Sequence, residues 1–274
     1  MQVFTDSGET LLASAIENLK TTSFPNSLSA WLQCRLPYDN ITILAYFQNR
    51  QPVLLMFENR QPKVHENFAR VYLAGTYLLD PFHNLHVKNA PAGVYRLSDI
   101  APDNFRRNQY FLEYYGNTTM VDEFAFVSHP SPGISLHVCL GRDSNSNKRF
   151  KNRELARAHR LSPLVTSLTS GHWNDLRSVG AAVEGQVSSN LIGATKREHG
   201  ISLSPRQAEV AMLVLQGHSS VSIGLKLGIS FQTVKVFRKQ LYKKCNISSQ
   251  AELFNLMIPI LGSLQGNLPD RPPD

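Results

Sequence analysis

A run of short, well-capped helix patterns separated by glycine turns, near the C-terminal end, constrains the fold of this chain most. The tetrapeptide Ser204-Pro205-Arg206-Gln207 opens the first of them. Ser204 can cap the helix, Pro205 suits the first helical position, and Gln207 can bond back to the cap. This helix is expected to end at Gly217.

Two further helices follow at close spacing. The second fits Ser220–Leu227, and the third opens after Ser230 and runs to about Lys244. Only Gly228-Ile229-Ser230 joins them. A short helix, a tight glycine turn and a longer helix predict a helix-turn-helix.

The third helix has two different faces. Val234, Leu241 and Cys245, with Phe237 or Arg238 between them, form a seam that can dock on the first two helices. The other face carries Lys235, Val236, Arg238, Lys239, Tyr242 and Lys243. Such a helix fits the major groove of DNA, where its first two turns reach base edges and its cations neutralise phosphates. The alternative is a basic face that is only solvated.

The charge distribution favours a nucleic-acid partner. The whole chain has 28 Lys and Arg residues against 21 Asp and Glu residues, a formal net charge of +7. Nine basic and three acidic residues lie between Lys196 and Leu261, so this stretch carries +6 of the net charge. A local excess of this kind is typical of a surface that binds a polyanion.

Three stretches carry a family resemblance: Leu203-Ser204-Pro205-Arg206-Gln207-Ala208-Glu209-Val210, Gly217-His218-Ser219 and Leu227-Gly228-Ile229-Ser230-Phe231-Gln232-Thr233-Val234-Lys235. Over Leu203–Leu256 the chain resembles the DNA-binding domain of LuxR-type transcription factors. The resemblance implies that Lys235, Val236 and Lys239 face the bases, while Thr233, Arg238 and Lys243 lie nearer the phosphates. It also implies a transcriptional regulator that binds double-stranded DNA, with RNA polymerase as a further partner if the protein is an activator.

A fourth helix opens with Ser249-Gln250-Ala251-Glu252, another capping-box pattern. It presents Leu253, Leu256, Met257 and Ile260 on one side. In the family that the chain resembles, this helix pairs two copies, which implies a homodimer. The alternative is that these residues pack against their own domain.

The first 170 residues mix helical and extended patterns. Helices are expected over Leu11–Lys20, Leu28–Arg35, Glu66–Leu79 and Asn104–Gly116, and a long basic helix begins near Phe150. Strands fit Ile41–Phe47, Pro52–Phe57, Glu123–Val127 and Ile134–Leu140, while Asp80–Pro102 reads as irregular. Together these patterns predict an α+β N-terminal sensor domain, an antiparallel sheet flanked by helices, followed by an all-α four-helix helix-turn-helix domain.

The expected domain order follows from changes in composition. A signal-sensing domain covers 1–170, a linker rich in Gly, Ser and Asn covers 171–202, the helix-turn-helix domain covers 203–261, and a flexible tail covers 262–274. A GAF- or PAS-like sensor fits this layout only by analogy.

One carboxylate in the first domain lies among aromatic residues. Asp80-Pro81 follows a stretch with Phe68, Tyr72 and Tyr77, and Tyr95 comes fifteen residues after the Asp. This spacing resembles the LuxR-type proteins that sense acyl-homoserine lactones, which implies a small-molecule effector bound by Tyr72, Asp80 and Tyr95. The carboxylate would accept an amide N–H while the rings cover the apolar part of the ligand. The alternative is a structural turn at Asp80 in a regulator without a ligand, controlled by a protein partner or by its expression level.

Other function classes lack support in the sequence. There is no Walker loop, no G-x-G-x-x-G and no H-E-x-x-H, so neither an enzyme nor a cofactor is expected. His137 and Cys139 share a strand face without a further pair, so no metal site is predicted. Cys34, Cys139 and Cys245 form no close pair, which favours a reducing compartment. With no signal-peptide pattern and no long apolar run, we expect a cytoplasmic protein without membrane contact.

Overall fold

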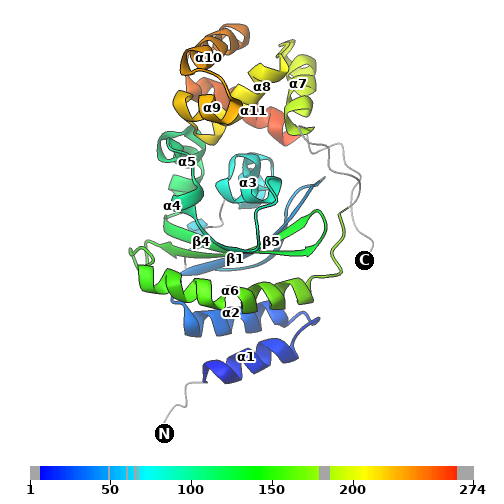
Figure 1. Cartoon of the computed structure of the whole chain (residues 1–274), viewed down its shortest axis with the longest axis vertical. Helices are drawn as coiled ribbons and strands as arrows, with labels where there is room; N and C mark the ends of the chain where they lie inside the picture. Colours follow the sequence, from blue (N-terminus) through cyan, green and yellow to red (C-terminus); the bar gives the residue numbers. More distant parts are fainter. Residues whose placement is uncertain are drawn as a thin grey trace. The chain divides into compact units, whose positions relative to one another are not determined.

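The computed structural model describes residues 7–48, 50–59, 61–64, 66, 68–178 and 186–263 (Figure 1). These residues form two compact units, each assembled from three segments of the chain. The sheet unit takes Met1–Pro62, Leu85–Asp99 and Thr119–Gly180, and the helical unit takes Lys63–Asn84, Ile100–Thr118 and Ala181–Asp274. The predicted domain boundaries at 170 and 203 stay a prediction. Residues 264–274 of the predicted tail lie outside the described residues.

The sheet unit contains α1 (Gly8–Glu17), α2 (Phe24–Arg35), β1 (Asn40–Phe47), β2 (Val53–Asn59), β3 (Gly93–Arg96), β4 (Met120–Ser131), β5 (Ile134–Asp143) and α6 (Asn152–His172). The described strands form one antiparallel sheet with the order β2-β1-β5-β4-β3. All four strands predicted from the sequence are present, and so is the long helix after Phe150. The antiparallel sheet flanked by helices is therefore confirmed.

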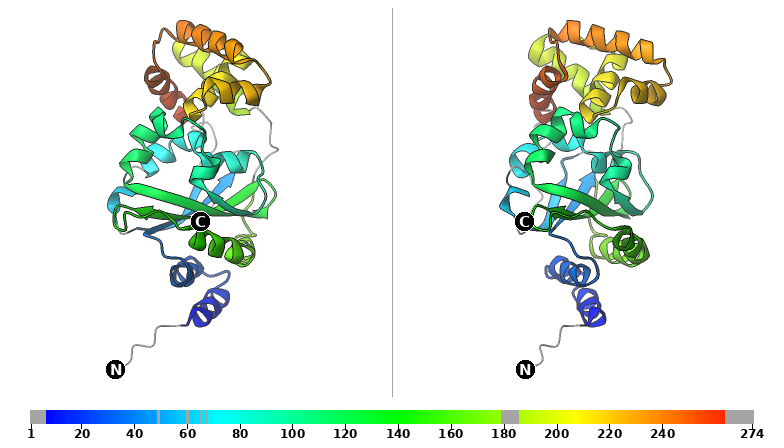
Figure 2. Two further views of the ribbon diagram at one scale, coloured as in Figure 1. Left: turned by 60° about the vertical axis from the view of Figure 1, so that its left-hand side comes forward. Right: turned by 90° about the vertical axis from the view of Figure 1, so that its left-hand side faces the viewer.

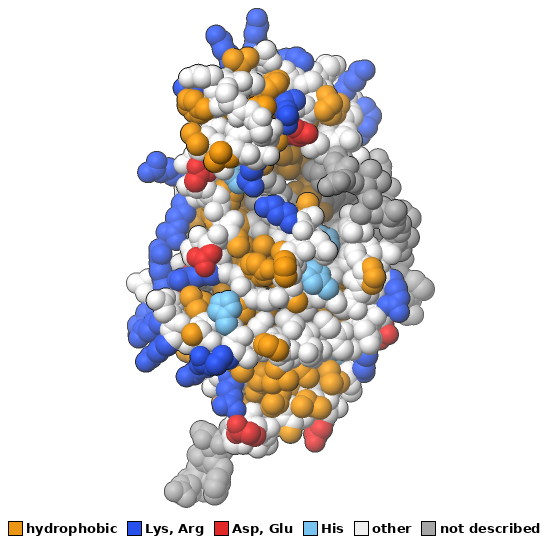
Figure 3. All heavy atoms as spheres, viewed as in Figure 1, with side chains coloured by type: hydrophobic (Ala, Val, Ile, Leu, Met, Phe, Trp, Pro, Cys, Tyr) orange, Lys and Arg blue, Asp and Glu red, His pale blue; other side chains and the backbone are white. Residues whose placement is uncertain are grey.

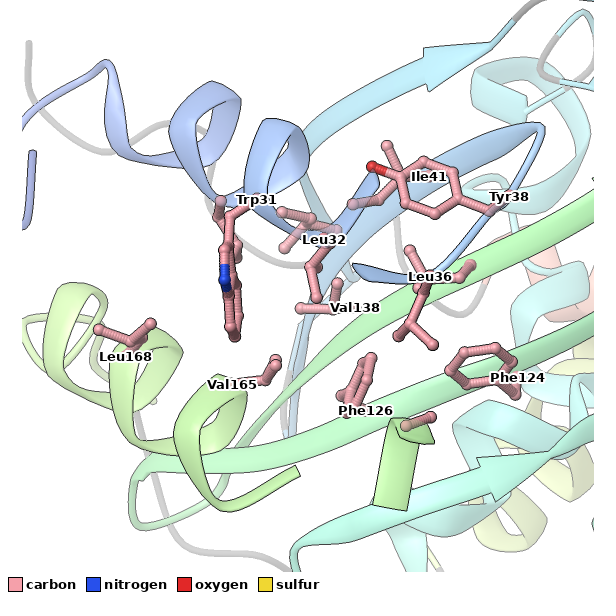
Figure 4. Packing of buried hydrophobic residues seen from close by; sticks show 14 of the residues in the cluster. Trp31, Leu32, Leu36, Tyr38, Ile41, Phe124, Phe126, Val138, Val165 and Leu168 are labelled. Atoms are coloured by element: carbon pink, nitrogen blue, oxygen red, sulfur yellow. The ribbon is translucent and has the colours of Figure 1, made fainter. Parts of the chain in front are cut away.

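Helices α2 and α6 cover one face of the sheet, and α1 packs on the outer side of α2 (Figures 1 and 2). Figure 4 shows how Trp31 and Leu32 of α2 and Val165 of α6 meet side chains of the strands. The alternation along β4 and β5 explains the contact, because Phe124, Phe126, Val138 and Leu140 all point to this face and are fully buried. The odd-numbered residues of β5 alternate with these, so Ser135, His137 and Cys139 point to the opposite face.

The helical unit contains η2 (Phe68–Tyr72), η3 (Thr76–Leu79), η4 (Phe105–Arg107), α5 (Gln109–Glu113), η5 (Tyr115–Asn117), α7 (Gln186–His199), α8 (Pro205–Gln216), α9 (Ser220–Leu227), α10 (Phe231–Cys245) and α11 (Gln250–Ser263). A boundary between the two units falls within each of three short elements: η1 (Pro62–Val64), α3 (Pro81–Val87) and α4 (Leu97–Ile100). The four helices predicted after Leu203 are confirmed as α8 to α11.

Several predictions for the middle of the chain are wrong. The helix expected over Glu66–Leu79 is a π-helical turn and a 3₁₀ turn, interrupted at Gly75, whose φ of 142° an α-helix does not allow. Asn104–Gly116 breaks into η4, α5 and η5. Asp80–Pro102, expected to be irregular, contains α3, β3 and α4.

The predicted linker also contains regular structure. Helix α7 occupies Gln186–His199, within the expected linker 171–202. Leu191, Ala194 and Thr195 of this helix are fully buried, and α7 contacts α8 and α11. Helix α7 is thus stabilised by packing against other helices, which the Gly-, Ser- and Asn-rich composition of this stretch does not reveal.

Candidate functional site

The first helix of the predicted DNA-binding motif begins and ends as its sequence indicates. At the start of α8, the Gln207 amide donates to Ser204 Oγ at 3.3 Å, and the Ser204 amide donates to Gln207 Oε1 at 3.1 Å. The capping box is therefore formed. At the other end Gly217 adopts a φ of +95°, the left-handed conformation that ends many helices.

A three-residue turn joins α9 to α10. Gly228 ends α9 with a φ of 64°, and Ser230 caps α10 by accepting from the Thr233 amide at 3.0 Å. Val234, Leu241 and Cys245 are buried, as the predicted seam requires. The helix-turn-helix geometry is confirmed.

The opposite side of α10 presents its charges to solvent. Thr233, Lys235, Val236, Lys239 and Lys243 are exposed, and Val236 keeps 53% of its surface although it is apolar. Figure 3 shows Lys and Arg side chains projecting from the surface around the helices labelled α9 and α10 in Figure 1. An apolar side chain flanked by cations can read a thymine methyl group while its neighbours bind phosphates.

Two of the basic residues of α10 have partners within the motif. The Arg238 guanidinium donates to Ser220 Oγ at 3.1 Å and lies 5.8 Å from the Tyr242 ring, so this half-buried residue also ties α10 to α9. The Lys235 ammonium lies 4.3 Å above the Phe231 ring, a cation–π contact that orients the lysine at the start of the helix. Phe231 was not among the predicted site residues, although its place directly after the cap could have indicated it.

The apolar side of α11 is mostly buried. Leu253, Met257 and Ile260 are fully buried, and only Leu256 of the four predicted interface residues is half-buried. Most of this side is therefore used inside the chain, as the alternative of packing against its own domain expects, and Leu256 is the one of the four that stays partly accessible. The homodimer itself stays a prediction.

The predicted ligand anchor is built from a carboxylate and a tyrosine. The Tyr72 hydroxyl donates to Asp80 Oδ2 at 2.6 Å, and the Phe82 amide donates to Asp80 Oδ1 at 2.8 Å. Burial raises the pKa of Asp80 from 3.8 to about 6, although the hydrogen bonds from Tyr72, Phe82 and Tyr110 act in the opposite direction. Asp80 is thus a buried acid that titrates close to neutral pH.

An aromatic cluster surrounds this pair. It consists of Phe68, Tyr72, Tyr77, Tyr110 and Tyr114, all of them buried. The Tyr72 ring stacks on Phe68 at 4.8 Å and on Tyr114 at 5.5 Å between centroids. Tyr110 lies on α5 and Tyr114 is the residue that ends it. The sequence analysis missed both, although the density of aromatic residues from Tyr110 to Tyr115 is a usable signal.

The third predicted ligand residue has different surroundings. Tyr95 lies on β3 in the sheet unit, and its hydroxyl donates to the Pro91 carbonyl at 2.8 Å. The structure therefore brings Tyr72 and Asp80 together and gives Tyr95 a local partner. Its role in ligand binding stays a prediction.

A cleft of about 380 Å³ lies elsewhere in the sheet unit. It is lined by Asn26, Ser29, Ala30, Gln33, Tyr38, Asp39, Glu58 and Asn59. None of the three predicted ligand residues lines it.

Within the described ranges, no three His, Cys, Asp or Glu side chains are grouped so that they could hold a metal ion. His137 is fully buried, with its Nε2 3.0 Å from Ser135 Oγ. None of the helices in the described part of the chain is both long and apolar enough to cross a bilayer.

Comparison with known proteins gives a family match and a fold match. The family described as "Bacterial regulatory proteins, luxR family" matches residues 201–257. A "Putative HTH-type transcriptional regulator in exeN 3'region" of Aeromonas salmonicida is 32% identical over 184 residues, which cover 65% of this chain and 93% of that protein.

Among solved structures, the VqsR LBD domain from Pseudomonas aeruginosa is 24% identical with a TM-score of 0.52, covering 62% of this chain and 98% of that one. Escherichia coli SdiA is 16% identical with a TM-score of 0.43, covering 92% of this chain and 96% of that one. The likeness to the VqsR domain concerns the fold.

Proposed function

Because the chain belongs to the LuxR family of bacterial transcriptional regulators, we propose that it reads its operator through the exposed face of α10. Lys235, Val236 and Lys239 contact base edges, while Thr233, Arg238 and Lys243 contact phosphates. The observation that carries this assignment is the exposed apolar Val236 between exposed lysines on a capped helix. The protein works in the cytoplasm, where the chromosome is, and RNA polymerase is a further partner if it activates.

A binding-site selection with the full chain tests the assignment. Lys239→Ala should weaken binding to the selected duplex by roughly 1–3 kcal/mol and relax the base preference at one position. Lys88→Ala removes the same charge from an exposed residue outside the motif and serves as the matched control. Affinity should also fall steeply with salt. If Lys239→Ala weakens all sequences equally, Lys239 binds phosphate and the assignment to bases is wrong.

The second part of the proposal is a small, partly apolar effector that binds at Tyr72 and Asp80, with Tyr95 as a third contact. Its support is a buried carboxyl with a raised pKa inside the aromatic cluster. A carboxylate has about four acceptor sites, more than Tyr72, Phe82 and Tyr110 together use, so a ligand N–H can still be accepted. Native mass spectrometry of the protein isolated from its own cells should detect a bound small molecule, and Asp80→Asn should reduce the bound fraction.

The competing proposal is a regulator without an effector. It is favoured by the same two hydrogen bonds, because they satisfy both oxygens of Asp80 within the chain. In that case, protein from its own cells carries no ligand, and Asp80→Asn leaves operator binding unchanged. Control by a protein partner or by expression level would then remain.

The last part of the proposal is a homodimer on a DNA site with two-fold symmetry. One recognition helix contacts only a few base pairs, so two copies are needed for a specific site of useful length. Half-sites would lie about one helical turn apart. Footprinting on the selected operator measures this spacing.

A further inference from the structure

A short segment in the middle of the chain is bonded to the corner between α8 and α9. We call residues 103–108 the corner segment, which contains η4 and the residue that caps α5. Asp103 Oδ1 accepts from the Ser219 amide at 2.9 Å, the Asn104 amide donates to the Gly217 carbonyl at 3.0 Å, and Asn108 Nδ2 donates to the Leu215 carbonyl at 3.2 Å. All of these residues belong to the helical unit.

The fit at Gly217 is close. A Cβ atom added to this glycine would lie 3.0 Å from Phe105 Cα and 2.6 Å from Asn108 Nδ2. Phe105 and Asn108 are 3% and 1% exposed. The corner segment therefore packs against the helix-turn-helix with buried atoms as well as hydrogen bonds.

Asp103 places a negative charge at the start of α9. Burial acts to raise the pKa of this carboxyl, but the hydrogen bonds from Ser219 and the nearby His218 outweigh it, and the pKa is lowered. From the neighbouring helix, the Arg238 guanidinium reaches the first residue of α9, Ser220, at 3.1 Å. The Asp103 carboxylate is thus bound at the start of α9, and the Arg238 guanidinium also reaches this end of the helix.

DNA presents its own anions to this part of a helix-turn-helix. In such motifs, the first helix of the pair crosses the DNA backbone, and N–H groups at helix starts bond to phosphates. Asp103 occupies the Ser219 amide that a phosphate would use, and two negative groups cannot share it.

The corner segment is also connected to the predicted effector anchor. Asn108 Oδ1 caps α5 by accepting from the Phe111 amide at 2.8 Å. The same short helix carries Tyr110, which acts to lower the pKa of Asp80, and it ends at Tyr114, whose ring stacks on Tyr72. A displacement of α5 by a ligand would therefore act directly on Asn108.

We propose that the corner segment is an internal inhibitor of DNA binding, which docks on the α8–α9 corner through Asp103 and Asn108 and must leave before a duplex contacts that corner. The proposal rests on the proposed DNA-binding function. In this proposal, the Ser219 amide binds a DNA phosphate once Asp103 has left it. Helix α5 then transmits a change at the Tyr72–Asp80 pair to Asn108 and so to DNA binding.

The test selects duplexes with the wild type and with Asp103→Ala separately, and measures dissociation constants of the full chain for the selected duplexes. If about nine molecules in ten hold the docked segment, Asp103→Ala should bind up to about tenfold more tightly. Asp99→Ala removes a negative charge from an exposed residue four positions earlier, and should change affinity far less. Asn108→Ser keeps a capping oxygen for α5, removes the donor to Leu215 without a change in charge, and should also tighten binding.

Hydrogen exchange gives a second measurement that does not depend on the charge of a variant. The Asn104 amide is bonded to Gly217 in the free protein, so saturating the wild type with duplex should accelerate its exchange. The proposal is wrong if the affinities are equal for Asp103→Ala, Asn108→Ser and the Asp99→Ala control. It is also wrong if the protection of the Asn104 amide is unchanged in the complex. If neither the wild type nor Asp103→Ala binds any selected duplex, the DNA-binding function itself fails. A wild type that binds no duplex beside an Asp103→Ala that does supports the inhibitor.

Discussion

Replacing Asp80 by asparagine removes a buried charge from the aromatic cluster. The folded-state pKa of Asp80 is raised from 3.8 to about 6, so this carboxyl stabilises the fold only while it is protonated. That stability is fully present below pH 3.8 and is lost as the pH rises through about 6. The shift corresponds to about 3 kcal/mol for the fully ionised group, and roughly half of this stability is lost between pH 5 and pH 8.

Asparagine can keep the geometry without the charge. Its oxygen accepts from the Phe82 amide, and its NH₂ donates to the Tyr72 hydroxyl, whose proton rotates away. Urea unfolding of both proteins from pH 5 to pH 8 should therefore show the stability of Asp80→Asn rising relative to the wild type by roughly 1 kcal/mol. Asp99→Asn, at an exposed carboxyl, is the control. Parallel pH profiles refute the buried-charge argument, and a loss of several kcal/mol at every pH would make Asp80 a structural turn residue.

Two further changes test other parts of the fold. Gly217→Ala should lower the free energy of unfolding by more than about 1 kcal/mol, because alanine at a φ of +95° is strained and its Cβ meets the Phe105 backbone; an unchanged urea midpoint contradicts this. Leu256→Asp should shift sedimentation from dimer to monomer while the thermal midpoint stays nearly the same, since Leu256 is only half-buried. If sedimentation and the operator footprint both stay unchanged, the dimer contact lies elsewhere.

The helix-turn-helix could be predicted in detail because its signals are local. Ser204, Gly217, Gly228 and Ser230 act on the backbone within a few residues, and each ends or begins a helix as its chemistry requires. The strands could be predicted for a related reason. Their apolar alternation follows directly from burial of one face.

The middle of the chain could not be predicted because its structure depends on distant contacts. Tyr110 and Tyr114 have a helical pattern, yet α5 ends at Glu113, and the Tyr114 ring packs on Tyr72, 42 positions earlier. Strand β3 has only four residues and exists through pairing with β4. The two alternatives for α11 could not be decided for the same reason, since the pattern of Leu253 and Met257 indicates an apolar face but not what covers it.

The raised pKa of Asp80 also makes the binding of an effector at this residue depend on pH. A ligand that donates an N–H to Asp80 favours the ionised form, so its binding must release a proton near pH 6 and must tighten as the pH rises through that range. A ligand that accepts a hydrogen bond from the protonated carboxyl gives the opposite sign. Calorimetry at pH 6 in two buffers of different ionisation enthalpy measures the number of protons exchanged. Release that disappears in Asp80→Asn identifies an N–H donor, uptake excludes one, and binding without proton exchange places the ligand away from Asp80.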